Sequence, residues 1–314
     1  MDPINAVLTP PDLEKFRALT GVGDAPLEVN FEGWSKLAIL TDDRVFLFPR
    51  WGQDELLIHG AVVCEALAEV PYVPRVRQRW PEGTLSAGPF VAFDRRTGTP
   101  WIDREESASL AEFERMLRSL GQAIATWHRI DPTTLPAGVG KPGDFDEKPW
   151  LSAFLDPVRV EDAVSQAVDL TRADKSTASV WRRVVPALAR MKPVLVHGDA
   201  CENQLLVDEQ DRVHTVLDWD TAGIGHPLHD FDFGEWGIPI FRWETEFGRL
   251  RRAMWGGYCA ELGASPATVE EVHLLFTLAE LAQVEERPAA GSWAQRRLAA
   301  CRAAIGPATA AVVG

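Results

Sequence analysis

The segment VLVHGDACENQLLVDEQDRVHTVLDWDTAGIGHPLHD, residues 194–230, sets the interpretation of the whole chain. Its first three residues are apolar, and a polar loop that contains HGD follows them. The loop ends in a second apolar run at 205–207, and a polar cluster at 208–212 turns the chain into a third run at 213–217. This alternation predicts a strand, a loop and then a two-stranded hairpin.

Two aspartates stand at the ends of these predicted strands. Asp199 lies in the loop after the first strand, and Asp218 follows the third. Because the hairpin brings the strand ends together, we expect both carboxylates to face one cleft. Loop aspartates often only cap backbone amides. Two carboxylates with different tasks, however, are what phosphoryl transfer needs, since one accepts the proton of the attacking hydroxyl and the other holds magnesium.

The two motifs, HGD-x-x-x-x-Q and LDWD-x-A-G-x-G-x-P-x-x-D, resemble the active-site signature of the aminoglycoside phosphotransferase family, whose members are related to protein kinases. The resemblance implies that Asp199 is the catalytic base and that Asp218 binds Mg²⁺. It also implies ATP or GTP as the phosphate donor. His197 and Asp230 would hold the catalytic loop in place rather than take part in the chemistry.

The second magnesium ligand departs from the family pattern. The family has asparagine five positions after the catalytic aspartate, whereas this chain has Gln204 there and Asn203 one place earlier. The apolar run after Gln204 continues in the family register. The resemblance therefore assigns the metal to Gln204, which offers the same amide oxygen on a longer arm, and leaves Asn203 as the less favoured alternative.

The N-terminal part is expected to begin with a helix at 11–20 and to continue as three strands, LEVNF, KLAIL and VFLFPR, within residues 27–50. The turn between the first two strands falls where the family has its nucleotide-covering loop. Gly33 permits a close backbone approach at this turn. By the resemblance, Ser35 is a candidate phosphate ligand.

The phosphate-binding lysine of kinases should follow on the third strand, but Leu47 stands in its place. The helix expected at 54–70 should carry the partner glutamate, and Gly60 lies near that position. Loss of both is coherent, because a buried glutamate without its cation is costly. Phosphotransferases of the viomycin and capreomycin type resemble this chain in the same double loss. Lys36 or Arg50 is expected to supply the positive charge instead.

The segment GPFVAFDRRTG, residues 88–98, resembles the strand and hinge that connect the two lobes of a kinase. By that resemblance, the adenine base would contact the backbone C=O of Asp94 and the N–H of Arg96. Phe93 would line the adenine pocket.

The expected fold class is α+β, a protein-kinase-like fold with an N-terminal lobe of antiparallel sheet plus helix and a mainly helical C-terminal lobe. The predicted division gives a nucleotide-binding lobe at 1–95 and a catalytic and acceptor-binding lobe at 96–314. Helical spacing of apolar residues predicts a core helix over 110–130. Further helices are expected within 150–191, 243–262, 266–286 and 292–305.

The chain has 314 residues, enough for two lobes, and a formal net charge of −14. This charge argues against nucleic acid and anionic membranes as partners and favours a cationic small molecule. Between residues 226 and 286, 11 Asp and Glu face 4 Arg and no Lys. Asp232 and Glu235, close to the catalytic hairpin in sequence, are therefore candidates for acceptor binding. Solubility alone is the alternative reason for the acidity.

The expected location is the cytoplasm. The chain begins without the basic and apolar regions of a signal peptide, and no apolar run approaches the roughly 20 residues of a membrane helix. Its four cysteines are scattered without metal-ligand spacing, which is typical of free thiols in a reducing compartment.

The sequence thus predicts a magnesium-dependent phosphotransferase that acts on a hydroxyl of a cationic small molecule, with an aminoglycoside or a basic peptide antibiotic as the favoured acceptor. A metabolic kinase for choline, homoserine or a sugar is one alternative. A catalytically dead nucleotide- or drug-binding module is another. The missing lysine–glutamate pair favours the dead module, and the two retained aspartates oppose it.

Overall fold

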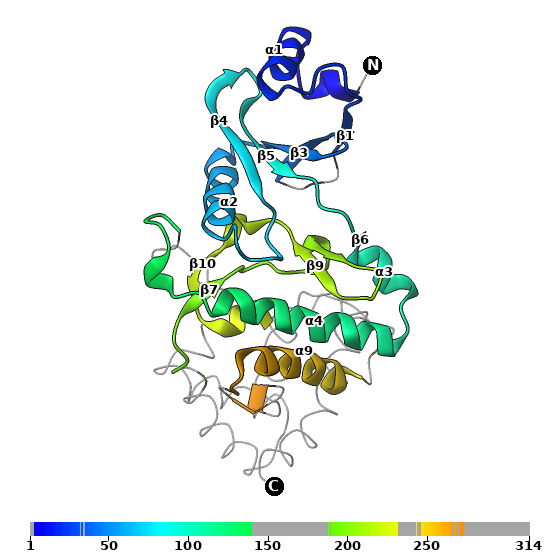
Figure 1. The fold of residues 1–314 in the computed structure, drawn as a ribbon, viewed down its shortest axis with the longest axis vertical. Helices are drawn as coiled ribbons and strands as arrows, with labels where there is room; N and C mark the ends of the chain where they lie inside the picture. Colours follow the sequence, from blue (N-terminus) through cyan, green and yellow to red (C-terminus); the bar gives the residue numbers. More distant parts are fainter. Residues whose placement is uncertain are drawn as a thin grey trace, which may run out of the picture.

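The computed structural model describes residues 3–139 except 32 and 34, residues 188, 190–231 and 243, and residues 246–272 except 266, 269 and 270. In Figure 1 an antiparallel sheet with two helices forms one part, and a mainly helical part lies beneath it. Among the described residues, no helix has both the length and the apolar character needed to cross a membrane.

The N-terminal part is built on a five-stranded sheet in the order β1-β2-β3-β5-β4, and every neighbouring pair is antiparallel. Its strands are β1 (Glu28–Asn30), β2 (Lys36–Leu40), β3 (Arg44–Pro49), β4 (Val76–Leu85) and β5 (Gly88–Asp94). The three strands predicted within 27–50 are confirmed, because alternating apolar residues and tight turns define them locally.

One helix lies on each side of this sheet. α1 (Pro10–Thr20) covers the face to which Phe46 and Phe48 of β3 contribute an aromatic core. α2 (Asp54–Ala66) packs on the other face, where Leu47 joins a second core. α2 ends earlier than the predicted residue 70; proline at position 71 disfavours helical conformation in the residue before it.

Side-chain alternation along β2 determines where Lys36 points. Ile39 belongs to the aromatic core on the α1 side. Successive side chains of a strand point to opposite faces, so Lys36, three residues earlier, points to the α2 side. Lys36 and Leu47 therefore lie on the same face of the sheet.

The second part is organised around two packed helices, α4 (Leu110–His128) and α9 (Phe247–Leu262). A capping box of Ser109 and Glu112 begins α4. The two helices approach closely because Gly121 and Gly257 lack side chains: a Cβ on either would overlap a backbone carbonyl oxygen of the facing helix. The core helix predicted over 110–130 is confirmed.

Residues 205–216 form the predicted hairpin, β8 (Leu205–Val207) with β9 (Val213–Val216). β7 (Val194–Val196) instead pairs antiparallel with β10 (Gly223–Gly225), which the sequence did not predict. Two other unpredicted elements follow β5: β6 (Thr99–Pro100), which pairs with β8, and α3 (Trp101–Ser107).

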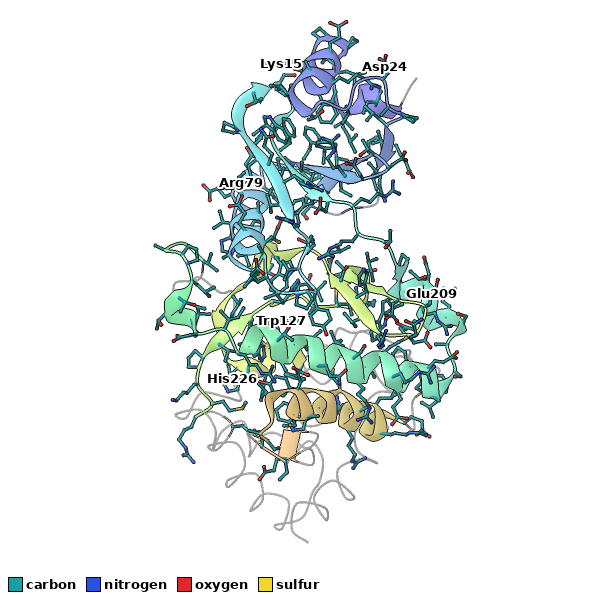
Figure 2. The ribbon with its side chains drawn as sticks, viewed as in Figure 1. Lys15, Asp24, Arg79, Trp127, Glu209 and His226 are labelled. Atoms are coloured by element: carbon teal, nitrogen blue, oxygen red, sulfur yellow. The ribbon has the colours of Figure 1, made fainter. Side chains whose placement is uncertain are left out.

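Short 3₁₀ helices complete the description: η1 (Pro3–Ala6), η2 (Pro132–Thr134), η3 (Glu202–Gln204), η4 (Trp219–Thr221) and η5 (Pro227–Phe231). Side chains fill the space between α4 and the neighbouring strands, where Trp127 lies fully buried (Figure 2). The helices expected within 150–191 and 292–305 lie outside the described residues, as does most of the one expected at 266–286.

Candidate active site

The loop after β7 carries Asp199 and is held by the buried carboxylate of Asp230. The backbone N–H groups of His197 and Gly198 donate to this carboxylate over 3.0 Å and 2.9 Å. The indole N–H of Trp127, at the end of α4, donates to it over 2.8 Å. Asp230 therefore fixes the start of the loop from which Asp199 projects.

Burial alone would raise the pKa of Asp230. The hydrogen bond from His128 and the bond from the Gly198 N–H oppose burial and lower the pKa to about 2. His128 Nε2 lies 3.0 Å from Oδ2 of Asp230. Asp230 is thus ionised at neutral pH and organises the loop, as the sequence predicted.

His197 connects this loop to the end of β9. Its Nδ1 lies 3.2 Å from the backbone nitrogen of Asp199 and accepts that N–H. The other ring nitrogen, Nε2, can then donate to the carbonyl of Leu217, 2.8 Å away. His197 has no exposed surface, so it has a bracing role, in agreement with the sequence.

Two further hydrogen bonds bring Gln204 close to Asp218 and join the two loops of the site. The N–H of Leu217 donates to the carbonyl of Gln204 over 2.7 Å, across the open end of the β8–β9 hairpin. The Thr221 hydroxyl donates to the carbonyl of His197 over 2.9 Å. The loop of Asp199 and the turn of Asp218 are therefore adjacent, as the predicted hairpin required.

Asp218 has an unusual backbone conformation. Its φ of 60° and ψ of 64° place it in the left-handed region. A residue with a side chain pays about 1–2 kcal/mol for this conformation. Such local strain concentrates at functional sites, where the surrounding structure holds it.

Lys36 enters the same site from β2. Its ammonium group forms ion pairs with Asp218 and with Asp220, the latter at 2.7 Å. Burial lowers the pKa of Lys36, but the two carboxylates outweigh burial and the net pKa is raised. Burial raises the pKa of Asp220 to about 6; Lys36 opposes this shift and Asp218 adds to it.

The donor set at Asp218 and Gln204 suits Mg²⁺, which prefers oxygen ligands and usually keeps waters and substrate phosphates in its shell. Gln204 lies beside residue 217 and is half-buried, whereas Asn203 is exposed. No cluster of three or more His, Cys, Asp or Glu suited to a metal occurs among the described residues. A site of this kind would need the nucleotide phosphates to complete it.

The predicted nucleotide-covering turn is tight. A Cβ on Gly33 would lie 2.5 Å from the carbonyl oxygen of Lys36, so only glycine fits without a shift. Arg50 donates from its guanidinium to the carbonyls of Phe31 and Gly33, over 3.2 Å and 2.8 Å. The Arg50 N–H donates to the carbonyl of Ser35 over 2.9 Å. Of the two candidate cations, Lys36 contacts the carboxylates of Asp218 and Asp220, and Arg50 holds the turn.

The hinge residues make structural contacts. The Asp94 N–H donates to the carbonyl of Arg75 over 2.9 Å, and its carboxylate pairs with Arg77. The guanidinium of Arg96 donates to the carbonyl of Val73 over 2.6 Å. Phe93 is buried. These contacts fix the path of the connector and leave adenine recognition there as a prediction.

The predicted acceptor residues and Cys201 remain to be placed. Asp232 and Glu235 lie outside the described residues, so the acceptor site keeps only its sequence basis. Burial and the neighbouring Asp199 raise the pKa of Cys201 to about 12. The thiol of Cys201 is therefore protonated at neutral pH.

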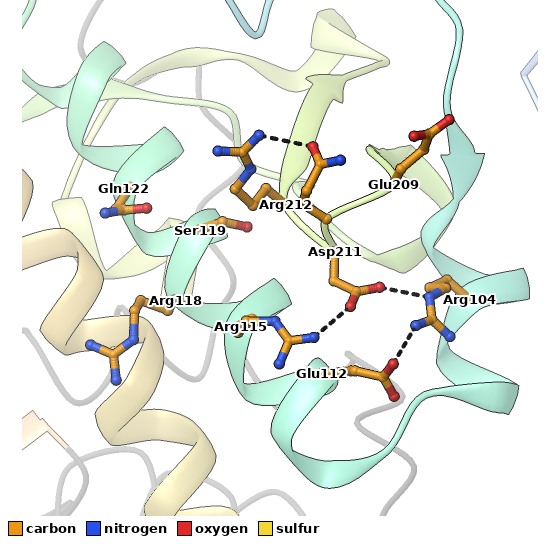
Figure 3. A pocket seen from close by; sticks show the side chains of 10 residues that line it. Arg104, Glu112, Arg115, Arg118, Ser119, Gln122, Glu209, Asp211 and Arg212 are labelled. Atoms are coloured by element: carbon orange, nitrogen blue, oxygen red, sulfur yellow. Dashed lines mark hydrogen bonds and ion pairs between the residues drawn. The ribbon is translucent and has the colours of Figure 1, made fainter.

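A pocket of about 650 Å³ lies at the turn end of the β8–β9 hairpin, opposite the end that carries Gln204 and residue 217. Figure 3 shows Arg104 and Arg115 converging on Asp211 at its floor, over 2.7 Å and 2.8 Å. Glu112 neutralises Arg104 from the other side. These ion pairs fix the hairpin turn against α3 and α4.

Sequence reasoning did not identify Asp220 as a site residue. Asp220 is 9% exposed and is paired with Lys36. The signal available in the sequence was the second aspartate of the DWD tripeptide at 218–220. Its partner is 184 positions away, so the sequence alone could not connect the two.

A sequence model of the phosphotransferase enzyme family matches residues 55–272 of the chain. No curated protein sequence matches this chain. The chain is similar to the solved structure of wild-type aminoglycoside 2'-phosphotransferase-IIIa with GDP, at 18% identity and a TM-score of 0.57, with 95% of this chain and 97% of that chain covered.

Macrolide 2'-phosphotransferase type I gives 18% identity and a TM-score of 0.54, with 95% of this chain and 98% of that chain covered. ADP-bound aminoglycoside phosphotransferase APH(2'')-Ib gives 12% identity and a TM-score of 0.51, with 92% of this chain and 97% of that chain covered. At these identities the likeness shows the fold alone. It confirms the expected kinase-like, two-lobed α+β architecture.

Proposed function

Since the chain belongs to the phosphotransferase enzyme family, we propose that it moves the γ-phosphate of ATP or GTP to a hydroxyl of a cationic small molecule. One observation carries the proposal: the Thr221 hydroxyl bonds to the His197 carbonyl and the Leu217 N–H to the Gln204 carbonyl, so that the loop of Asp199 and the turn of Asp218 meet beside the ammonium group of Lys36. This arrangement offers a base, metal ligands and a phosphate-binding cation in one site.

In the proposed mechanism, Asp199 orients the acceptor hydroxyl and takes its proton as the oxygen–phosphorus bond forms. The nucleoside diphosphate leaves with the electrons of the broken bond. Lys36 binds phosphate oxygens. Asp218 and Gln204 would hold Mg²⁺, which offsets phosphate charge when it is bound. Asp230 keeps Asp199 in position through the backbone of the loop.

For the acceptor, we favour an aminoglycoside or a basic peptide antibiotic, bound through acidic side chains that include Asp232 and Glu235. The net charge of −14 supports a cationic acceptor and opposes nucleic acid or a membrane as partner. The similar solved structures are named for aminoglycoside and macrolide phosphotransferases, and their titles include GDP and ADP. We retain the lobe division near residue 95 and a cytoplasmic location as parts of the proposal.

The test is mass spectrometry of an acceptor panel incubated with the protein, magnesium and either ATP or GTP. The panel contains aminoglycosides, macrolides, basic peptide antibiotics, choline, homoserine and simple sugars. We expect one added phosphate on a cationic antibiotic and none when magnesium is chelated. Transfer to choline, homoserine or a sugar alone would replace the proposal by a metabolic kinase. Nucleotide binding without transfer to any acceptor would favour a binding module.

A further inference from the structure

By the resemblance to kinases, the positions of the phosphate-binding lysine and of its glutamate partner carry neither residue in this chain. Leu47 occupies the strand position, and Gly60 lies at the helix position. A cation and a carboxylate still meet in this region, since Lys36 Nζ lies 2.7 Å from Oδ2 of Asp220. One partner comes from β2 and the other from η4, so neither stands at the position that the family uses.

From the neighbouring strand β2, Lys36 can bring its ammonium group to the region that a lysine at position 47 would reach. Ala38 is the register partner of Leu47, and Lys36 precedes Ala38 by two residues, on the same face of the sheet. Relative to Leu47, Lys36 lies one strand across the sheet, about 4.8 Å, and two residues along the strand, about 7 Å. The long lysine side chain spans such a shift and brings its ammonium group to the catalytic carboxylates.

Because Gly60 has no side chain, the Asp220 carboxylate fits beside α2. A Cβ on Gly60 would overlap an oxygen of the Asp220 carboxylate and lie 3.2 Å and 3.3 Å from its backbone nitrogen and Cα. Next to Gly60, the Nε2 of His59 hydrogen-bonds the carbonyl of Ala222 over 2.8 Å. α2 is therefore fixed directly against η4, and a side chain at position 60 would force the carboxylate away.

Burial makes the two partners depend on each other. The side chains of Lys36 and Asp220 are each 10% exposed. A buried charge without a partner is strongly disfavoured. Asp218 is more exposed, at 28% for its side chain, and is the proposed metal ligand. Asp220 is thus the carboxylate that can stay on Lys36 while Asp218 binds metal.

We propose that Asp220 is the positioning residue for Lys36 and that Gly60 leaves the space for its carboxylate. A pair between β2 and η4 then takes over the task of the usual pair between β3 and the helix. An ammonium group has three donors, so Lys36 can keep Asp220 and still donate to a phosphate oxygen. Only the donation from Lys36 to a phosphate oxygen rests on the proposed function. The pair of Lys36 and Asp220 does not depend on catalysis.

The test is a double-mutant cycle on magnesium–nucleotide affinity, measured by calorimetry, with Lys36→Met, Asp220→Asn and the double variant. If Asp220 acts only through Lys36, Asp220→Asn weakens binding about 10-fold and Lys36→Met about 100-fold. The double variant is then no weaker than Lys36→Met. Multiplied effects in the double variant would assign Asp220 a separate structural role and overturn the proposal.

Two glycine variants give a second test. Gly60→Ala should weaken nucleotide binding as Asp220→Asn does, because the added methyl displaces the carboxylate. Gly256→Ala is the matched control, a helical glycine whose added Cβ would meet only Arg118 at 3.8 Å, and its affinity should match the wild type. Unchanged nucleotide affinity in Gly60→Ala would contradict the proposal.

The same variants separate this inference from the proposed function. Their unfolding free energies, from urea titrations, report the pair without any turnover. Coupling between Lys36 and Asp220 in stability but no phosphate transfer to any acceptor would retain the pair and reject the proposed function. Phosphate transfer with no coupling in either stability or affinity would retain the function and reject the pair.

Discussion

Replacing Asp230 by asparagine should lower both stability and turnover. The carboxylate accepts four hydrogen bonds: Oδ2 from Trp127, His128 and the His197 N–H, and Oδ1 from the Gly198 N–H. Asparagine can keep an oxygen toward the first three, but its NH₂ group then faces the Gly198 N–H. One buried donor loses its acceptor and charge assistance is lost, which costs about 2–3 kcal/mol.

The pH dependence of stability gives a second estimate of the same size. The folded pKa of Asp230, about 2, lies below the ordinary value of 3.8. A depressed carboxylate pKa stabilises the fold above the unfolded pKa, and this stability is lost as pH falls through the folded value. The shift corresponds to roughly 2–3 kcal/mol at pH 7, and roughly half of it is lost by pH 3.

The assay is urea unfolding of wild type and Asp230→Asn at pH 7, 5 and 3, together with turnover at pH 7. The stability gap between the two proteins should narrow by about 1 kcal/mol between pH 5 and pH 3. Asp211→Asn is the control, since Asp211 is also buried and charge-paired but lies at the far end of the hairpin. Equal loss of turnover in both variants, or a gap independent of pH, would refute the bracing role of Asp230.

Gly121→Ala should destabilise the protein by about 1–3 kcal/mol in urea titrations, because its methyl would overlap a carbonyl of α9; Gly256→Ala, which has room, should not. Gln204→Ala should weaken magnesium-dependent nucleotide binding more than Asn203→Ala does, and the reverse order would move the ligand by one residue. The acceptor KM should rise with potassium chloride, because screening shortens to about 8 Å at physiological salt, and Asp232→Asn should reproduce part of the rise. A KM indifferent to both would leave the acidity as a solubility feature.

Much of the local structure could be predicted because local sequence determines it. Alternating apolar residues and turn residues define the strands within 27–50 and the hairpin that carries Asp218. Elements that depend on distant partners were missed. The strand at 223–225 is only Gly-Ile-Gly and exists because it pairs with 194–196. The two-residue strand at 99–100 likewise exists through its pairing with β8.

The candidate site shows the same division. Motif spacing located Asp199, Asp218 and the bracing residues His197 and Asp230. The resemblance at the third strand predicts that the usual lysine is missing and leaves Lys36 as one of two candidate replacements. It could not indicate where Lys36 reaches, because that depends on the face of β2 and on a turn 182 positions away.

The central claim is that Asp199 is the base of a phosphoryl transfer, and the most direct measurement compares Asp199→Asn with wild type on the acceptor identified by mass spectrometry. Turnover should fall by at least about 100-fold, because both proton transfer and positioning of the hydroxyl are lost. Magnesium–nucleotide affinity should stay within about twofold of wild type, since Lys36 and Asp218 remain. Near-normal turnover in Asp199→Asn would contradict the account.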